Sequence, residues 1–182
     1  MRAGSKPPLA ATANRATVAK RGARRYGTTF RPRTWRSSWG KTMARLTGRC
    51  LCGAVRWETD GPVLWAGHCH CDSCRRATSA PFTTFFGVPR DGVVWTGQLA
   101  DHVTSGGSVR RQFCPDCGSQ LTYQSTRWPE ETHLYAASLD DPSQITPAAH
   151  FHFEEKLPWL AITDDLPKYA ATADGAVPIQ DQ

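Results

Sequence analysis

The chain has 182 residues, which is enough for one domain of ordinary size and too few for two. Its hydrophobic share is 40%, so it can form a core, and its sequence has no run of about 18 apolar residues that would span a membrane. The formal charge of +6 is unevenly distributed, because residues 1–45 carry 12 of the 22 basic residues and no acidic one, whereas the remainder carries −6. We therefore predict a soluble protein in which a basic leader precedes a mildly acidic body.

The leader mixes Arg, Ser, Thr, Ala and Pro without a sustained apolar periodicity. Such a segment cannot bury enough apolar surface to offset its ordering entropy, so we predict a disordered leader over residues 1–45. A transit peptide and a basic arm for nucleic acid would both have this composition. A third interpretation is that synthesis starts at Met43, just before the first cysteine motif, with upstream codons included by mistake. We favour it because composition alone identifies targeting segments poorly.

From Gly48 onward, short runs of β-forming residues alternate with turns that contain Gly, Pro and Asp. This pattern predicts strands, in chain order, over Ala54–Thr59, Val63–Gly67, Phe82–Val88, Val93–Thr96, Ser108–Phe113, Gln120–Gln124, Thr132–Ser138 and Ala149–Phe153. One short helix is expected near Cys71–Thr78. Strands of about five residues separated by turns are typical of an all-β domain of packed sheets. We place this domain at residues 46–169 and predict a flexible tail over 170–182.

Seven cysteines form three clusters, Cys50-x-Cys52, Cys69-x-Cys71-x-x-Cys74 and Cys114-x-x-Cys117. An odd number of cysteines cannot pair fully into disulfides, and the short spacings favour metal ligation in a reducing compartment. We therefore expect a cytoplasmic protein. In the last cluster, Pro115 and Gly118 shape a turn that can point both sulfurs at one ion.

The number of cysteines suggests how they are divided between metal sites. A structural zinc site takes four ligands, whereas a catalytic one takes three and keeps an open position. Cys50 and Cys52 would face the same side of an extended strand, so they could join Cys114 and Cys117 in a closed site and leave the middle cluster open. Two alternatives remain at this point. One of His68, His70, His150 and His152 closes the middle site, or the middle cluster joins the Cys114–Cys117 turn instead.

Three segments resemble the motifs of a known family: Gly48–Val55 (GRCLCGAV), His68–Arg75 (HCHCDSCR) and Phe113–Gly118 (FCPDCG). They are similar to those of the glutathione-dependent formaldehyde-activating enzymes, which share a domain with centromere protein V. The similarity extends in motif order to Tyr169 and includes His152, Lys156–Trp159 and Asp165–Pro167. The resemblance implies a β-tent, in which antiparallel sheets fold over one another. It also implies a structural zinc on Cys50, Cys52, Cys114 and Cys117 and a catalytic zinc on Cys69, Cys71 and Cys74.

We therefore predict a zinc-dependent carbon–sulfur lyase, similar to S-hydroxymethylglutathione synthase, that contains two zinc ions. It would form or cleave the adduct of a small thiol such as glutathione with formaldehyde or a related aldehyde. Arg75 and Arg76 directly follow Cys74 and could bind a glutathione carboxylate. His150 and His152 are candidates for proton transfer or for orienting a ligand.

Five aromatic residues could wall a small substrate pocket, although such residues more often form core: Trp65, Phe82, Phe85, Phe86 and Trp95. The alternative to an enzyme is a non-catalytic two-zinc domain that uses the basic leader to contact nucleic acid or a protein partner. The acidic body argues against nucleic acid as the main ligand, because phosphate contacts need a basic surface. We expect no membrane partner.

Overall fold

A computed structural model describes residues 45–104, 106–174 and 176–179. The elements are, in chain order, β1 (Leu46–Arg49), β2 (Arg56–Thr59), β3 (Trp65–Cys69), α1 (Asp72–Thr78), β4 (Thr83–Pro89), β5 (Val93–Thr96), β6 (Ala100–Val103), β7 (Val109–Phe113), β8 (Gln120–Ser125), β9 (Glu131–Tyr135) and β10 (His150–Phe151). Three short 3₁₀ helices follow β9 and β10: η1 (Ala136–Ser138), η2 (Pro142–Gln144) and η3 (Phe153–Glu155). The predictions for the leader and for a start at Met43 fall on residues 1–44 and lie outside the described residues.

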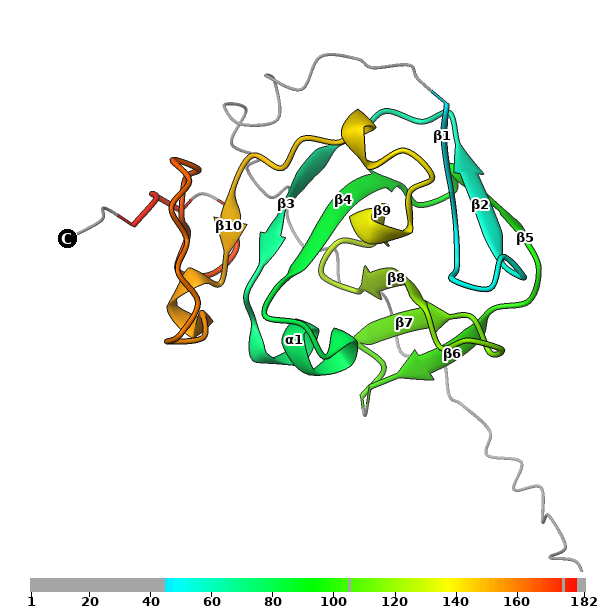
Figure 1. Cartoon of the computed structure of the whole chain (residues 1–182), viewed down its shortest axis with the longest axis horizontal. Coiled ribbons are helices and arrows are strands. Elements are labelled where there is room, and N and C mark those ends of the chain that lie inside the picture. The colour runs from blue at the N-terminus through cyan, green and yellow to red at the C-terminus, as the bar shows by residue number, and fades with distance from the viewer. Residues whose placement is uncertain (1–44, 105, 175, 180–182) are drawn as a thin grey trace, which may run out of the picture. The chain divides into compact units, whose positions relative to one another are not determined.

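The strands form two sheets (Figure 1). The smaller sheet has the order β1-β2-β5, and the larger one has the order β10-β3-β4-β9-β8-β7-β6. All neighbouring strands are antiparallel except β10, which pairs in parallel with β3 at the edge of the larger sheet. The helix α1 lies where β3 passes into β4 (Figure 1), so it sits at one end of the larger sheet.

Both faces of the larger sheet are buried in its centre. Phe86 of β4 and Leu134 of β9 face the smaller sheet, where they pack in one core with Leu46 and Trp57. The residues adjacent to them in these strands, Phe85 and Tyr135, belong to a second core on the opposite face. Successive side chains of a strand point to opposite faces, and so the two central strands contribute to both cores.

The prediction of an all-β fold is confirmed, and most of the predicted strands and the helix α1 are present. Two strands were missed, β1 and β6. The predicted strand over Ala149–Phe153 is wrong beyond Phe151, because His152 adopts a left-handed φ of 53° and the chain enters η3. Likewise the predicted strand over Thr132–Ser138 ends at Tyr135, where η1 begins.

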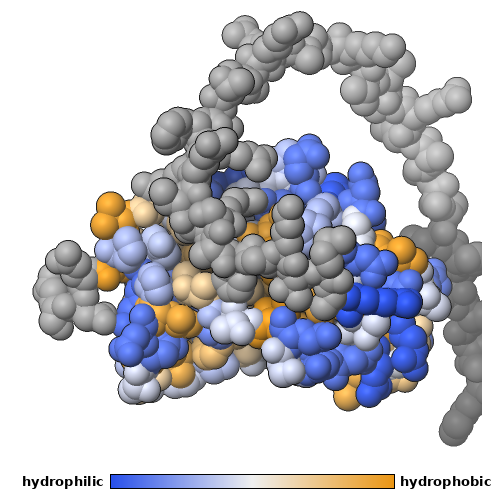
Figure 2. All heavy atoms as spheres, turned by 90° about the horizontal axis from the view of Figure 1, so that it is seen from above, coloured by the Kyte–Doolittle hydropathy of each residue, from blue (hydrophilic) through white to orange (hydrophobic). Residues whose placement is uncertain are grey.

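The surface shown in Figure 2 is mostly hydrophilic, with separate hydrophobic spots. None of the helices formed by the described residues is long and apolar enough to cross a membrane. After Tyr169, in the segment predicted as a flexible tail, Ala173 is buried and the Ile179 amide donates to the Lys168 carbonyl at 2.6 Å. The domain bounds derived from the sequence stay a prediction.

Candidate functional site

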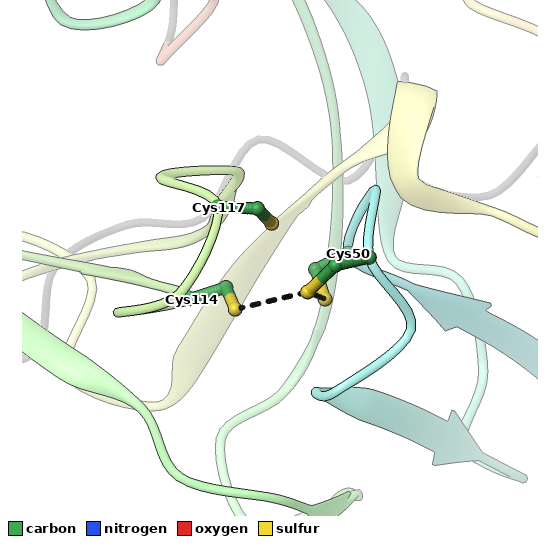
Figure 3. A group of neighbouring side chains, drawn as sticks. Cys50, Cys114 and Cys117 are labelled. Carbon is green, nitrogen blue, oxygen red and sulfur yellow. Dashed lines mark hydrogen bonds between the residues drawn. The ribbon is translucent and has the colours of Figure 1, made fainter.

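The first and last cysteine clusters meet in one group. The sulfurs of Cys50, Cys52, Cys114 and Cys117 all lie within 4.8 Å of one another. Figure 3 shows Cys114 and Cys117 pointing across a gap toward Cys50. Cys52 Sγ is 3.5 Å from Cys50 Sγ and 3.8 Å from Cys114 Sγ. This arrangement could hold one metal ion. We call it the four-cysteine cluster.

Two turns converge to form the four-cysteine cluster. Cys114–Gly118 closes through a hydrogen bond from the Gly118 amide to the Cys114 carbonyl, and Gly118 has the left-handed φ of 72° that its position required. The expectation that Cys50 and Cys52 face one side of an extended strand is wrong, because β1 ends at Arg49. They instead lie in a turn in which the Gly53 amide donates to the Cys50 carbonyl at 3.1 Å.

The middle cysteines form a separate group, which we call the triplet. The sulfurs of Cys69, Cys71 and Cys74 lie within 4.8 Å of one another. Cys69 ends β3, and Cys71 is the N-cap of α1, with its sulfur accepting a hydrogen bond from the Cys74 amide at 3.3 Å. The junction of strand and helix therefore brings three sulfurs together from six consecutive residues.

Close packing gives the three thiols of the triplet very different acidities. Hydrogen bonds from the Cys69 and Cys74 thiols lower the pKa of Cys71 to about 2, despite its burial. The pKa of Cys69 is raised far above its ordinary value, chiefly by the hydrogen bond to Cys71 and also by burial. Three thiols this close can share one negative charge but cannot all ionise without a cation, and this is the donor set that a soft divalent metal satisfies.

No histidine or carboxylate of the described residues joins the triplet as a fourth donor. Three of the four candidate histidines have hydrogen-bond partners elsewhere. His68 Nδ1 is 2.9 Å from Thr84 Oγ1, and His70 Nε2 is 2.9 Å from His150 Nδ1. In the described part of the chain, the triplet thus offers three ligands where the four-cysteine cluster offers four.

The triplet opens onto a cavity of about 110 Å³. Its walls are aromatic, from Trp65, Phe85, Tyr123, Trp128 and Phe151. Of the five predicted pocket residues, only Trp65 and Phe85 line it. Phe86 and Trp95 belong to the core between the sheets, and Phe82 lines a larger, more open depression beside the four-cysteine cluster.

A buried polar pair from β9 also lines the cavity. Glu131 Oε2 accepts a hydrogen bond from Trp65 Nε1 at 2.8 Å and lies 3.4 Å from His133 Nε2. The imidazole of His133 lies edge-on to Trp65, with ring centroids 4.6 Å apart, and stacks on Tyr123 at 5.4 Å. The sequence reasoning did not single out this pair, because all five residues of β9 are buried and no polar–apolar alternation marks it.

A buried arginine lies against the triplet. Arg111 of β7 is 6% exposed, and its Nη2 donates to Ser73 Oγ at 3.0 Å and to Cys74 Sγ at 3.9 Å. Its guanidinium also lies over the Tyr123 ring. Within the described residues, no carboxylate forms an ion pair with Arg111. Burying an unpaired charge is costly. The position of Arg111 therefore indicates that its guanidinium pairs with negative charge on the sulfurs of the triplet.

A chain of hydrogen bonds supports the triplet from behind. The Asp164 carboxylate accepts from His150 Nε2 at 3.0 Å. His150 Nδ1 in turn faces Nε2 of His70, the residue that stands between the first two cysteines of the triplet in the chain. If Asp164 is ionised, His150 must donate to it, so His150 Nδ1 accepts and His70 Nε2 donates. Burial lowers the pKa of His70 to about 4, which favours its neutral form.

His152 joins the cavity to the start of α1. Its Nδ1 is 3.1 Å from Glu155 Oε1, while Glu155 Oε2 accepts from the Asp72 amide at 2.7 Å. His152 lines the cavity with the triplet, and it is one of two described non-glycine residues with a positive φ. Such backbone strain is frequent at functional sites.

The two predicted substrate-binding arginines lie on α1 but not in the cavity wall. Arg75 is mostly buried, and its Nε donates to the His70 carbonyl at 2.9 Å. Arg76 is largely exposed, and its Nε pairs with Asp72 at 2.8 Å. Their role as substrate contacts stays a prediction.

Known proteins share these motifs. Residues 45–155 match the family model described as glutathione-dependent formaldehyde-activating enzyme. The chain belongs to this family of enzymes. A protein of Halomonas elongata named "Putative glutathione-dependent formaldehyde-activating enzyme" is 32% identical over 128 residues, which are 64% of this chain and 80% of that protein.

Two further proteins are similar over smaller parts of this chain. A protein of Schizosaccharomyces pombe named as an uncharacterized lyase is 30% identical over 86 residues, 46% of this chain and 61% of that protein. A crystal structure of a Rhodobacter sphaeroides protein covers 56% of this chain and 91% of that one, with 24% identity and a TM-score of 0.46. The family-model match and the Halomonas protein confirm the resemblance noted in the sequence at the level of the family.

Proposed function

We propose that this member of the family is a carbon–sulfur lyase that forms and cleaves the adduct of a small thiol, such as glutathione, with formaldehyde or a related aldehyde. The observation that carries this proposal is the triplet, which offers three sulfurs, no fourth donor among the described residues and an adjoining cavity. The name of the Halomonas relative and the lyase name of the yeast relative support it.

Zinc is the metal that we assign to both clusters, because donor sets made only of cysteine sulfur suit zinc. Cys50, Cys52, Cys114 and Cys117 would hold a closed structural ion, and Cys69, Cys71 and Cys74 would hold one with an open position. When bound at the triplet, zinc supplies the positive charge that keeps an entering thiol in its thiolate form. Arg111 offsets the negative charge that three thiolates bring to this side of the sheet.

The proposed reaction needs neither an oxidant nor a reductant. A bond forms between the thiol sulfur and the carbonyl carbon, the carbonyl π bond breaks, and the thiol proton ends on the former carbonyl oxygen. The reaction also proceeds without an enzyme, so the cavity beside the triplet mainly supplies proximity and activation of the nucleophile. Cleavage of the adduct is the same sequence in reverse.

We assign the proton transfer to His152. Because the Glu155 carboxylate accepts from the Nδ1 of His152, the neutral imidazole keeps a lone pair on Nε2. This nitrogen can take the thiol proton and return it to the oxygen of the adduct. Glu155 also accepts from the Asp72 amide, and this bond fixes the histidine relative to α1.

The two arginines of α1 would have different roles. Arg76 is exposed, and among the described residues its partner is the surface carboxylate of Asp72 alone, so it can turn toward a glutathione carboxylate. Arg75 is held by the His70 carbonyl, and it would mainly fix α1 against β3.

The direct test is exchange NMR on formaldehyde and glutathione, with and without the full-length protein. We expect faster interconversion with the protein and two zinc ions per chain. Cys71→Ser should remove the acceleration and one zinc, whereas His102→Gln, an exposed residue of β6, should change neither. No acceleration at catalytic protein concentrations would contradict the proposal, and one zinc per chain would contradict the division of the cysteines.

The role of His152 has its own test. His152→Gln keeps a polar side chain but cannot exchange a proton, so we expect the rate to fall by about 10²- to 10⁴-fold, with zinc content unchanged. The pH dependence of the remaining rate should also differ from that of the wild type. An unchanged pH profile would assign the proton to another group.

A further inference from the structure

The cavity beside the triplet is larger and more apolar than formaldehyde requires. It measures about 110 Å³, and five aromatic side chains line it together with a few polar residues, among them Glu131, His133 and Asp174. A cavity of roughly 150 Å³ lined by apolar side chains is known to bind benzene. Formaldehyde has no substituent beyond its hydrogens, so it would leave most of the apolar wall uncovered.

The aromatic wall is held in place before any ligand binds. Trp65 is fixed by its hydrogen bond to Glu131. Its indole can lie directly on β4, because the residue beneath it, Gly87, has no side chain. An added Cβ at Gly87 would overlap the Trp65 indole. Phe85 packs on Tyr135 with ring centroids 4.6 Å apart. A preformed apolar site of this kind favours a rigid apolar group of matching size.

The charge of the two reactants decides which one enters the cavity. Glutathione carries two carboxylates and an ammonium group, and transfer of the carboxylates into a largely aromatic cavity that is also lined by Glu131 and Asp174 is unfavourable. An uncharged aldehyde substituent meets no such cost. The thiol would therefore approach from the solvent side, where Arg76 lies, and the cavity would receive the substituent of the aldehyde.

We propose that the preferred aldehyde carries an apolar substituent about the size of one aromatic ring, as benzaldehyde does. This inference rests on the proposed function and names its substrate class. The ring would lie among Trp65, Phe85 and Phe151, with the carbonyl carbon toward the triplet. Addition of the thiol gives a hemithioacetal, in which the new carbon–sulfur bond replaces the carbonyl π bond and the thiol proton lies on the oxygen.

The test compares aldehydes of graded size with glutathione as the thiol. For formaldehyde, butyraldehyde, benzaldehyde and 2-naphthaldehyde, the enzymatic kcat/KM is divided by the uncatalysed rate constant of the same aldehyde. We expect this enhancement to be about ten- to a hundredfold larger for benzaldehyde than for formaldehyde, since that is the effect of burying one ring. It should fall again for 2-naphthaldehyde, which exceeds the cavity.

Two variants change the size of the cavity in opposite directions. Ala173 is buried in its wall, so Ala173→Phe should lower the ratio of the benzaldehyde to the formaldehyde enhancement by about tenfold. Trp128→Ala should raise the enhancement for 2-naphthaldehyde. Trp159→Ala is the matched control, because this exposed tryptophan does not line the cavity.

A binding measurement without turnover completes the test. Benzyl alcohol has the ring but no carbonyl, and we expect it to raise the unfolding temperature of the wild type and of Trp159→Ala, but not of Ala173→Phe. An enhancement for formaldehyde equal to or above that for benzaldehyde would overturn this inference and leave the proposed function intact. Acceleration of none of the aldehydes would overturn both.

Discussion

The four-cysteine cluster and the triplet lie on opposite faces of the larger sheet. Cys50 and Cys114 belong to the core between the two sheets, whereas Cys74 belongs to the core on the other face. The first cluster joins residues up to 67 positions apart and draws the turn after β1 to the turn after β7. The triplet comes from six consecutive residues and opens onto a cavity.

The four-cysteine cluster would thus serve the stability of the fold, and the triplet would serve the reaction. An ion in the four-cysteine cluster would close a long loop and fasten two sheets to each other, so the fold would depend on it. An ion in the triplet would close only the short loop between β3 and α1. That site can keep a free coordination position with little cost to the fold, and the cavity and Arg111 face it.

The largest contrast is expected between two cysteine variants. Cys114→Ser removes a ligand of the four-cysteine cluster, and because a structural zinc contributes about 10–16 kcal/mol, comparable to the whole stability of a domain, we expect loss of cooperative folding. Cys71→Ser should leave a folded protein with one zinc. Circular dichroism and metal analysis would check both. A folded Cys114→Ser protein beside an unfolded Cys71→Ser protein would reverse the comparison.

The charge next to the triplet provides the second contrast. Arg111→Gln removes the buried guanidinium, so we expect zinc at the triplet to bind about 10- to 100-fold more weakly, with the four-cysteine cluster unaffected. Competition with a chelator would measure both sites. Arg110→Gln is the matched control, because the preceding residue of β7 is exposed and pairs with Asp101. Equal effects of the two variants would show that only the general charge matters.

The hydrogen-bonded chain behind the triplet gives the third contrast. His150→Phe keeps a ring of similar shape but leaves the buried Nε2 of His70 without its partner, so we expect a loss of about 1–3 kcal/mol in the free energy of unfolding. In this variant, metal should also dissociate faster from the triplet than in the wild type, whereas dissociation from the four-cysteine cluster should not change. Denaturant unfolding with the exposed variant His102→Phe as control checks the first effect. A stability equal to the wild type would contradict the role of this chain.

The smallest effect concerns pH. Burial raises the pKa of Asp164, but hydrogen bonds from His150 and from the Leu166 amide outweigh it, and the net pKa lies below the ordinary 3.8. The unfolded state therefore binds this proton first, so the contribution of Asp164 is present above about pH 4 and is lost as the pH falls through the lowered pKa. Because the side chain is 44% exposed, we expect less than about 1 kcal/mol. Unfolding of Asp164→Ala between pH 3 and 6 should show a correspondingly smaller acid dependence, and an identical slope would contradict this.

Local patterns in the sequence predicted much of the fold. The turn at Cys114–Gly118 was predicted, and the short helix was placed at the triplet. Strands with clear β propensity, such as β4 and β8, were also predicted. The missed strands β1 and β6 have weak signals, since β6 is mostly exposed and carries Asp101 and His102 within four residues.

The candidate site was predicted only in part, for a physical reason. Arg110 and Arg111 are neighbours of the same type, and nothing in their sequence shows which one faces the triplet. The register of β7, with a bulge between Gln112 and Phe113, decides this. Glu131 and His133 lie in β9, which is buried on both faces. Its sequence therefore shows no alternation of polar and apolar residues that would mark these two as buried site residues rather than ordinary surface residues.

The sequence by itself determined the number of cysteine sulfurs, their short spacings and the turn at Cys114–Gly118, because these depend on residues close together in the chain. It left open which clusters would combine. Only the tertiary structure brought Cys50 and Cys52 to Cys114 and Cys117, and placed the triplet on the opposite face with Arg111 and an aromatic cavity. These contacts depend on how distant strands pair, and side chains point to one face or the other only once that pairing is set.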